Sequence, residues 1–360
     1  MKNKILKVIV VILIMILIIG IFVYFINKNT KEGTSKMSGY ELKSNINVVA
    51  SLEDEITEDT AWCGTFNLIW NDLKNDLAKQ DIVFTPQLKM VENLNKETFN
   101  TSYLSEDSYY KTYGIPSIQL KEKIEKEIKE KFNETSDILD SFDWENAGPE
   151  DYFLYSMLKK EFEFSKQFTE LPNGKFGNYE NVKYFGINSS TDENVREQVE
   201  VLYYNSKDDF AIKLKTKTDD EVIISKGNTQ NTFKEIYEEI QKNNQNYKDN
   251  KALTKNDTLQ IPNIDFNVKK EYEELENNTF KFSNGEEYKI DKALQTIQFS
   301  LDKKGGKIRS EAGMMVNKSS LLQDNPREFL VNDTFCIFLK EKNKELPYFA
   351  SKISDITKVQ

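Results

Sequence analysis

The sequence contains no histidine in 360 residues. Imidazole is the usual base of serine and cysteine hydrolases and a common zinc ligand, so its absence excludes Ser-His-Asp triads, Cys-His pairs and histidine-ligated zinc. The motifs GxGxxG, Walker A and GxSxG are also absent. Acidic residues are plentiful, but no spacing singles out a general acid and its base. We therefore expect a protein that is not an enzyme and that uses no cofactor or metal.

Cysteine is nearly absent as well, because the chain has only Cys63 and Cys336. Two cysteines are too few for the disulfide framework of a small secreted domain. Two alternatives remain open: one disulfide between Cys63 and Cys336 in an extracytoplasmic protein, or two separate buried thiols.

The charge balance lacks a basic excess. The net charge is −10, with 49 Lys and Arg against 59 Asp and Glu, and no basic stripe stands out along the chain. Phosphate contacts require clustered Lys and Arg, so nucleic acid is not an expected partner.

One long hydrophobic run is present, at residues 8–26. As a helix it would be about 29 Å long, close to the hydrocarbon thickness of a bilayer. A basic segment, residues 1–7, precedes it and predicts a cytoplasmic N-terminus with the bulk of the chain outside. A cleaved signal peptide is the alternative, but the run is long and no small-residue cleavage site follows. We expect a single-pass anchor in the cell membrane.

The anchor is followed by two further parts. Residues 27–58 are polar and predict a tether, and residues 59–360 are enough for one large extracytoplasmic domain or two small ones. The Lys, Asn and Ile content is typical of an AT-rich bacterial genome.

Helical periodicity occurs mostly early in the domain. Apolar residues at three- and four-residue spacing predict helices over 62–78, 119–132 and 231–242. The helix over 62–78 presents Trp62 and Phe66 on its apolar face. A short apolar run at 82–86, ended by Pro86, predicts a strand.

Strand patterns dominate the later part. The predicted strands are 152–164, 198–204, 209–215, 220–225, 258–266, 293–302, 334–340 and 346–350. Helices mostly first and strands mostly later indicate an α+β fold with large mixed or antiparallel sheets.

The stretch KGGKIRSEAGMM, residues 304–315, alternates like a strand although its composition is that of an exposed loop. One alternating set is small or apolar, namely Gly306, Ile308, Ser310, Ala312 and Met314. The other set is mostly charged, namely Lys307, Arg309, Glu311 and Gly313. Because successive side chains of a strand point to opposite faces, this is the pattern of a half-buried strand.

Five segments in the right order resemble the serpin family. The helix over 62–78 followed by the run at 82–86 looks like the first helix and the "FSP" strand of serpins. Residues 154–168, LYSMLKKEFEFSKQF, align without a gap on the pattern LVNAIYFKGKWEKPF. Residues 258–273 resemble the "LPKFKIEYDLK" segment, and 334–353 resemble the ending PFLFFIRDKKTGAILFMGKV. Asp302–Gly306 stands where serpins carry the hinge "DEKGT".

The resemblance implies a serpin-like fold with an exposed reactive-centre loop, here residues 303–328. Serpins inhibit a serine or cysteine protease when the cleaved loop inserts into the central sheet, so the implied partner is a target protease. The implied hinge and insertion residues are Lys303, Lys304, Gly305, Gly306, Ile308, Ser310 and Ala312. The implied scissile region is Ser319, Ser320, Leu321, Leu322 and Gln323, and the implied buried polar cluster under the sheet is Thr85, Ser156 and Gln295.

Three departures from the serpin pattern keep a second function open. The interval between Pro86 and the helix at 119 is too short for the full helical layer of the family. Lys303 replaces the hinge glutamate, and the alanine-rich run after the hinge is missing. The alternative is a non-inhibitory interaction protein on a serpin-like scaffold, anchored to the membrane.

Overall fold

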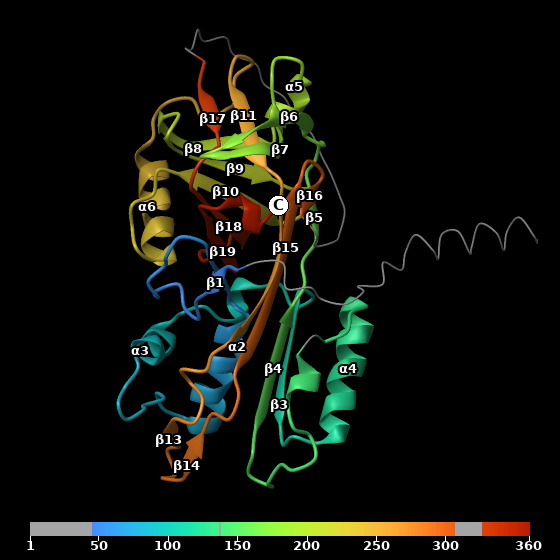
Figure 1. Cartoon of the computed structure of the whole chain (residues 1–360), viewed down its shortest axis with the longest axis vertical. Coiled ribbons are helices and arrows are strands. Elements are labelled where there is room, and N and C mark those ends of the chain that lie inside the picture. The colour runs from blue at the N-terminus through green and yellow to red at the C-terminus, as the bar shows by residue number, and fades with distance from the viewer. Residues whose placement is uncertain (1–44, 137, 307–325) are drawn as a thin grey trace, which may run out of the picture. The chain divides into compact units, whose positions relative to one another are not determined.

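The computed structural model describes residues 45–136, 138–306 and 326–360 (Figure 1). All of them belong to one compact unit, Leu42–Gln360. The predicted anchor (8–26), the tether up to residue 44 and the loop segment 307–325 lie outside the described residues. Within the described ranges, no helix is long and apolar enough to cross a membrane.

The described α-helices range from 4 to 15 residues in length. Their bounds are α2 Thr65–Asn71, α3 Lys89–Lys96, α4 Ile118–Phe132, α5 Glu193–Arg196 and α6 Phe233–Asn246. A π-helix, Asp72–Ala78, continues α2, and 3₁₀ turns occupy Thr101–Tyr103, Leu139–Ser141 and Ile356–Lys358. Ser117 and Thr232 begin α4 and α6 with side-chain oxygens that accept backbone N–H groups.

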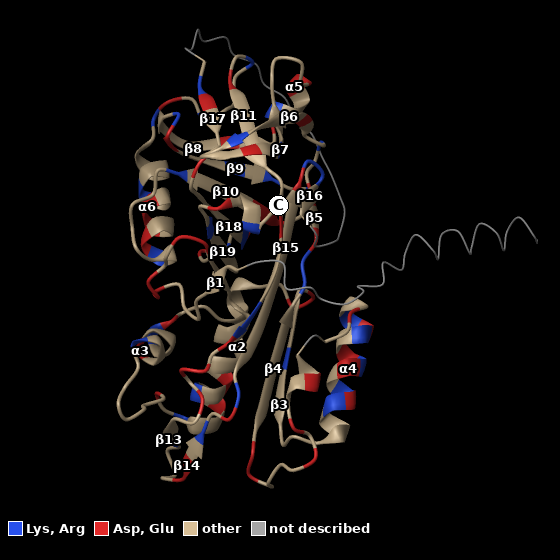
Figure 2. Cartoon of the chain, in the orientation of Figure 1, with Lys and Arg blue, Asp and Glu red and all other residues tan. Residues whose placement is uncertain are grey.

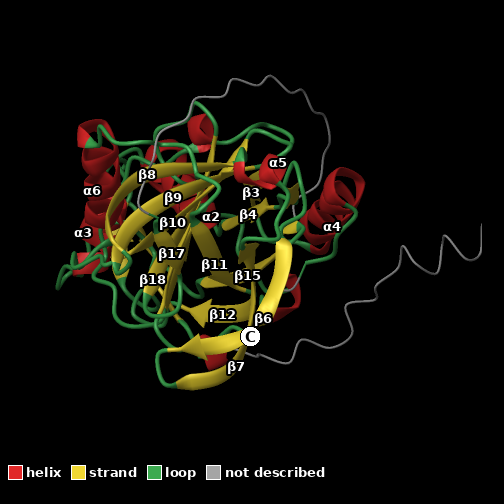
Figure 3. Cartoon of the chain, turned by 90° about the horizontal axis from the view of Figure 1, so that it is seen from above, coloured by secondary structure: helices red, strands yellow, loops and turns green. Residues whose placement is uncertain are grey.

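A seven-stranded mixed sheet forms the centre of the unit. Its order is β1 (Asn47–Val48), β2 (Thr60–Cys63), β19 (Phe349–Ile353), β18 (Phe335–Glu341), β10 (Asp220–Lys226), β9 (Asp209–Lys215) and β8 (Val199–Ser206). Only β1 and β2 pair in parallel. Helix α6 lies beside this sheet (Figure 3), with Phe233 and Tyr237 against Phe338 of β18.

Two four-stranded sheets flank it. One has the order β17 (Glu328–Leu330), β11 (Thr258–Pro262), β7 (Tyr179–Ile187), β6 (Thr169–Phe176). The other has the order β12 (Ile264–Glu271), β15 (Leu294–Asp302), β16 (Gly305–Gly306), β5 (Phe162–Glu163). Two hairpins complete the fold: β3 (Tyr109–Gly114) with β4 (Phe153–Leu158), and β13 (Thr279–Lys281) with β14 (Glu287–Lys289).

The packing divides into two hydrophobic cores. The large core joins the seven-stranded sheet to its neighbours and to α2, α3 and α6. A separate small core joins α4 to the β3–β4 hairpin through Ile124, Ile128, Trp144, Phe153 and Tyr155. The hairpin and its helix therefore form a block that is largely self-contained.

The α+β fold predicted from the sequence is confirmed, and so is most of the element order. Helices α4 and α6 and strands β8, β9, β10, β15 and β18 all fall where periodicity placed them. Charges of both signs intersperse along α4 and elsewhere (Figure 2), in keeping with the lack of a basic stripe.

The start of the predicted helix 62–78 was wrong. Trp62 lies in β2, and α2 begins only at Thr65. The two elements meet at Gly64, where an added Cβ would lie 2.1 Å from the Phe99 ring. The four-residue spacing of Trp62 and Phe66 fits a helix, but both faces of Thr60–Cys63 are buried, which is typical of an inner strand.

The predicted strand at 82–86 was also wrong, because these residues pair with no strand among the described ones. Burial does alternate there: Ile82 and Phe84 are buried and Val83 is exposed. The backbone is held by side chains instead. Asn95 donates to Ile82 O at 2.8 Å, and Phe84 N donates to Gln87 Oε1 at 2.8 Å.

Other predicted boundaries moved. The strand 258–266 is two strands, β11 and β12, in different sheets, with the break at Asn263. The strand 152–164 is divided into β4 and β5 at residues 159–161, and the last strand begins at Phe349 rather than 346. The β6–β7 hairpin was missed because Pro172, Asn173 and Gly174 read as a loop.

Candidate functional site: a gap between two strands

The candidate site is formed by β4 and β15, two strands that run in the same direction (Figure 1) and do not pair with each other in the described part of the chain. We call the interval between their backbones the gap. Strand β16 pairs antiparallel with both β15 and β5, and β5 continues the line of β4. Below β16, one edge of β15 pairs with β12, and one edge of β4 pairs with β3. The remaining edges of β15 and β4 face each other. Within 45–136, 138–306 and 326–360, no strand occupies the two edges that face each other.

The upper end of the gap is filled by Gly305 and Gly306. Gly306 lies opposite Leu301 of β15 and Phe162 of β5, and Gly305 lies opposite Asp302 and Glu163. Gly305 has φ +147°, and a Cβ there would lie 2.2 Å from Phe162 O. A Cβ on Gly306 would lie 2.6 Å from Cζ of Phe162. Only glycine allows the chain to enter between these strands.

The turn before the glycines, Lys303 and Lys304, is bound to the rest of the unit. Phe164 N and Phe168 N donate to Lys304 O and Lys303 O, each at 2.9 Å. The Lys303 ammonium pairs with Glu170 and lowers the pKa of that exposed carboxyl. Of the hinge residues expected from the sequence, Lys303 and Lys304 thus form a hydrogen-bonded turn, and Gly305 and Gly306 form the two-residue strand β16.

A polar cluster lies under the middle of the gap and is centred on Thr65, at the start of α2. Ser156 Oγ of β4 donates to Thr65 O at 2.7 Å. Gln295 Nε2 of β15 donates to Thr65 Oγ1 at 2.8 Å and to Cys63 O at 2.9 Å. Gln295 Oε1 accepts the Tyr272 hydroxyl at 2.7 Å, and burial raises the Tyr272 pKa well above its ordinary value. Both edges of the gap are therefore attached to one helix end.

The structure brings Ser156 and Gln295 together in this cluster, but it places Thr85 on the surface. Thr85 is therefore not part of the cluster. The prediction chose it because the run at 82–86 was expected to be the strand that leads into a helix, whereas that strand is β2, Thr60–Cys63, which leads into α2. With that strand moved, Thr65 falls at the start of the helix. Its signal in the sequence was the pair Gly64-Thr65 between a buried run and a helical run.

The two faces of β4 have different neighbours. Ser156 points toward α2, whereas Phe153 and Tyr155 pack in the core under α4. Alternation along the strand separates these faces. On the neighbouring strand β3, Lys111 pairs with the buried Asp72 of the π-helix, so the hairpin has a second attachment to the same helix.

A buried charge cluster lies at the bend between β4 and β5. The Lys160 ammonium is 2.6 Å from Asp220 Oδ1 and 2.7 Å from Glu341 Oε1, and all three side chains are buried. Tyr348 OH donates to Asp220 Oδ1 at 3.0 Å. Burial raises the pKa of Glu341, but bonds from Lys160 and Ser105 outweigh it, and the pKa is lowered overall. The cluster ties the bend to β10 and β18 of the seven-stranded sheet.

A partly buried arginine, Arg327, directly precedes strand β17. Arg327 donates to Asp257 Oδ2 from Nη2 at 2.8 Å, and its backbone N–H donates to Asp257 Oδ1 at 2.7 Å. Further bonds from its guanidinium reach Asn250 O at 2.6 Å and Ala252 O at 2.7 Å. The next residues form β17, which pairs with β11. The exit of the loop is thus firmly anchored.

Sequence reasoning missed Lys160, Arg327 and Asp257. A signal existed for the arginines, since the chain has only three, Arg196, Arg309 and Arg327. Two of them converge on Asp257: Arg327 binds its carboxylate and Arg196 Nη1 donates to its carbonyl at 2.7 Å. Arginine suits buried, bidentate contacts better than lysine does.

The two cysteines are not bonded to each other, so the disulfide alternative was wrong. Both are buried free thiols. Strand β19 separates β2 from β18, and Cys63 is in register with Phe349 whereas Cys336 is in register with Lys352. Two strand spacings of about 4.8 Å already exceed the Cα separation of a disulfide.

Other expected residues lie outside the described ranges. These are the insertion residues Ile308, Ser310 and Ala312 and the scissile region Ser319, Ser320, Leu321, Leu322 and Gln323.

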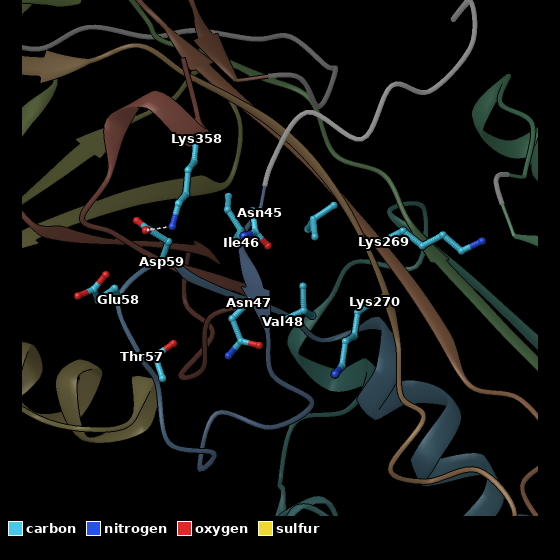
Figure 4. A pocket seen from close by; sticks show the side chains of 11 residues that line it. Asn45, Ile46, Asn47, Val48, Thr57, Glu58, Asp59, Lys269, Lys270 and Lys358 are labelled. Carbon is cyan, nitrogen blue, oxygen red and sulfur yellow. Dashed lines mark hydrogen bonds and ion pairs between the residues drawn. The ribbon is translucent and has the colours of Figure 1, made fainter. Parts of the chain in front are cut away.

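A separate groove of about 590 Å³ lies beside β12 and β1 (Figure 4). Its lining includes Asn47, Thr57 and Glu58, and an ion pair joins Lys358 Nζ to Asp59 Oδ2 at 2.7 Å. Lys269 extends away from the other lining side chains (Figure 4) and donates to Ser141 Oγ at 3.1 Å. The groove is polar and its central charges neutralise each other.

Comparisons with known proteins give structural likenesses only. No protein-family model and no curated protein match the chain. Its structure is similar to that of Serpin48 from the insect Tenebrio molitor, with 10% identity over 83% of this chain and 92% of that one and a TM-score of 0.46. It is also similar to the thermophilic serpin Tengpin in the native state (12% identity, 84% and 90%, TM-score 0.46). A third likeness is to thyroxine-binding globulin in complex with thyroxine (10% identity, 83% and 93%, TM-score 0.43). Serpin48 and Tengpin are serpins, and the serpin family is the one that the sequence resembles.

Proposed function

We propose that the chain is a serpin-like protease inhibitor whose segment after Gly306 enters the gap once a protease has cut it. The observation that carries this proposal is the position of Gly305 and Gly306, which already form a two-residue strand between β15 and β5. The next residues need only continue in the same direction to lie between the free edges of β15 and β4.

The register set by the glycines supports this proposal. If the chain after Gly306 continued antiparallel to both neighbours in this register, Ala312 would lie opposite Ser156 of β4 and Gln295 of β15. Residues directly opposite each other share a face of the sheet, so Ala312 would lie over the Thr65 cluster. The alternating set of Ile308, Ser310, Ala312 and Met314 would face the buried side, together with Phe299 and Ile297.

The other alternating set fits its surroundings as well. Lys307, Arg309 and Glu311 would lie opposite Ser300, Gln298 and Thr296 of β15, which are exposed or half-buried. Farther along, the residues of this set are uncharged. Gly313 and Met315 would lie opposite Tyr155 and Phe153 of β4.

Those two residues of β4 belong to the core under α4. The charged residues of this set would therefore face solvent. Its uncharged residues would lie on the side of β4 that helix α4 covers.

The driving force is the pairing of two free strand edges. Unpaired N–H and C=O groups on an edge are a template for another strand, and each hydrogen bond that a new strand makes contributes about 1 kcal/mol. A new strand between β4 and β15 would join two sheets into one. The cut is what frees the segment from Arg327, which anchors its other end.

The proposed target is a serine or cysteine protease that cuts within Ser319–Gln323. Its nucleophile would replace the amine at the scissile carbonyl and remain attached as an ester or thioester while the segment inserts. Leu321 and Leu322 suit a protease with a large apolar pocket. We also propose that residues 8–26 anchor the inhibitor in the cell membrane, with the domain on the extracytoplasmic side.

A second candidate is a non-inhibitory binding or interaction protein on the same scaffold. The fixed hinge turn favours it, because Lys303 is paired with Glu170 and both turn carbonyls accept hydrogen bonds from the segment after β5. A turn held in this way can simply end β15 rather than lead a strand into the gap.

Limited proteolysis of the full chain in detergent tests the proposal. A single cut near 319–323, mapped by mass spectrometry, should raise the melting temperature strongly because the segment becomes a strand. An unchanged melting temperature after a complete cut would contradict insertion. A covalent complex with the protease that survives SDS separates inhibition from the non-inhibitory alternative, which predicts cleavage without a trapped protease.

A further inference from the structure

Three aromatic side chains form a surface cluster beside the start of β4. Tyr152 directly precedes β4, and its ring centroid is 6.2 Å from that of Phe282 and 6.1 Å from that of Tyr288. The Phe282 and Tyr288 rings stack at 3.8 Å, with 20° between their planes. Phe282 is buried, whereas Tyr288 is half-buried and Tyr152 is 40% exposed. We call these three residues the aromatic cluster, and solvent reaches two of its rings.

Two exposed carboxylates lie beside the aromatic cluster. Glu286 Oε2 accepts the Tyr288 hydroxyl at 3.3 Å, and Glu150 stands two residues before Tyr152 in the chain. Desolvation raises the pKa of Tyr288, and the charges of Glu286 and Glu150 raise it further. No lysine or arginine of the described ranges forms an ion pair with either carboxylate. The rings are therefore bordered by negative charge that the neighbouring side chains do not neutralise.

The charge around the aromatic cluster has one sign. Residues 133–158, which lead from the end of α4 through β4, contain no lysine or arginine (Figure 2). Four exposed acids of this stretch pair with no cation in the part of the chain that the structure describes, namely Asp143, Glu145, Glu150 and Asp151. A surface of one sign attracts groups of the opposite sign within about 8–10 Å at physiological salt. The charge pattern therefore points to a cationic ligand.

Other rings of the unit already have a cation over one face. Lys131 lies over the Tyr109 ring at 5.6 Å, and Arg327 lies over the Phe329 ring at 5.5 Å. Within 45–136, 138–306 and 326–360, no lysine or arginine lies over a ring of the aromatic cluster. The face of an aromatic ring attracts cations electrostatically. Exposed rings and carboxylates thus meet at one place without a cation from the described chain.

We infer that the aromatic cluster, together with Glu150 and Glu286, binds an arginine side chain of a partner protein. Arginine fits better than lysine, because its planar guanidinium can stack on a ring while its N–H groups bind a carboxylate. Both arginines of the described ranges are engaged at Asp257, where Arg196 binds the carbonyl and Arg327 binds the carboxylate. We therefore assign the arginine to another protein. This binding goes beyond the proposed function and does not depend on insertion.

Short peptides test the preference for arginine. The uncut full chain in detergent is mixed with acetyl-Gly-Gly-Arg-Gly-Gly-amide, and saturation-transfer-difference NMR, which detects weak ligands of large proteins, gives the Kd. Matched peptides carry lysine or citrulline in place of arginine. The arginine peptide should bind about fivefold more tightly than the citrulline peptide, which has a similar shape but no charge. The lysine peptide should lie between them. Equal binding of the arginine and citrulline peptides would overturn the inference.

Substitutions test the two parts of the site. Tyr152→Leu should weaken binding about fivefold, because a ring face is lost while an apolar side chain remains. Tyr113→Leu is the matched control, since Tyr113 is also 40% exposed and lies on β3. Glu286→Gln should weaken binding by a similar factor. Glu287→Gln makes the same change of charge on the opposite face from Tyr288, because successive residues of a strand alternate, and it should bind like the wild type.

The outcomes separate this inference from its rivals. Wild-type affinity in both Tyr152→Leu and Glu286→Gln, with the circular dichroism unchanged, would overturn it. Glu286 is exposed, so its variant remains informative if Tyr152→Leu does not fold. Arg309→Ala should bind the peptide like the wild type, and tighter binding would assign the site to the chain's own arginine instead of a partner. A wild type that binds the arginine peptide but gains no stability when cut would remove insertion and leave this inference standing.

Discussion

Ser156 and Gln295 stand on the two strands that face each other across the gap, and they share one hydrogen-bond partner, Thr65. Ser156 uses the carbonyl of Thr65 and Gln295 uses its hydroxyl. A single residue at the start of α2 therefore contacts both halves of the sheet. A change in the separation of β4 and β15 would stretch or break one of these bonds, so Thr65 would control the insertion proposed above.

Thr65→Val should destabilise the uncut protein by about 1–3 kcal/mol, because the buried Gln295 amide loses one acceptor. It should also speed insertion after a cut, since one half of the sheet is released. Urea unfolding and the rate of the rise in melting temperature measure the two effects. Thr65→Ser keeps the hydroxyl and should restore both; equal losses in the two variants would show that packing of the methyl group matters instead.

Gly306→Val should prevent the stabilisation that follows a cut. The new side chain would meet the Phe162 ring at 2.6 Å and Ser300 O at 2.9 Å, so the chain could not remain between β15 and β5. Differential scanning calorimetry before and after proteolysis gives the comparison. Gly148→Ala is the control, since its Cβ would make only an ordinary contact at 3.4 Å with Asp151. Normal stabilisation of cut Gly306→Val would mean that the glycine pair is not the entry point.

Lys160→Met should cost about 3–5 kcal/mol, because it leaves two buried carboxylates without their cation. Adding Asp220→Asn and Glu341→Gln should recover much of this loss. Chemical denaturation of the single and triple variants is the measurement. Lys159→Met tests the neighbouring position, where the ion pair with Glu134 is partly exposed and should contribute less than about 1 kcal/mol. Equal losses at 159 and 160 would contradict the special role of the buried cluster.

The anchor at Arg327 should weaken in acid. Burial raises the pKa of Asp257, but the hydrogen bonds from Arg327 and from backbone N–H groups outweigh it and hold the pKa below its usual value. A carboxyl with a lowered folded pKa contributes stability that is present above its unfolded pKa and is lost as the pH falls through the folded value.

The hydrogen-exchange protection of Glu328–Leu330, taken relative to the intrinsic exchange rate at each pH, should therefore fall below the unfolded pKa of about 4. Asp257→Asn should show low protection at all pH values, with little further loss in acid. A wild-type protein whose protection in β17 depends on pH as little as that of the variant would contradict this prediction.

Both thiols should be inert in the native state. Cys63 and Cys336 are buried, and burial raises the pKa of both, that of Cys336 to about 12. A thiol reagent at pH 8 should label neither until denaturant is added, and a reductant should leave the melting temperature unchanged. Labelling of one native thiol at the rate of a free thiol would show that the sheet around it opens.

The α+β architecture was predictable because α4 and α6 carry helical periodicity and β8, β9, β10 and β18 are apolar runs of strand length. The choice between helix and strand at Trp62 was not, because its spacing to Phe66 fits a helix and only the neighbours of Thr60–Cys63 make it a strand. The same difference explains which members of the polar cluster could be predicted. Ser156 and Gln295 lie on strands with clear patterns, whereas Thr65 was displaced by the error at the helix start.

What the sequence by itself determined is local: the absence of histidine, the glycine pair, and an alternating segment able to form a strand. These depend on residue type and on spacing along the chain. Only the tertiary structure decided that the glycines lie between β15 and β5, that Thr65 joins both edges of the gap, and that the two thiols stay apart. Each of these depends on which strands become neighbours, and that follows from packing between segments far apart in the chain, such as those of Cys63 and Gln295, which are 232 residues apart. Periodicity records which face of an element is buried, but it does not record what lies against that face.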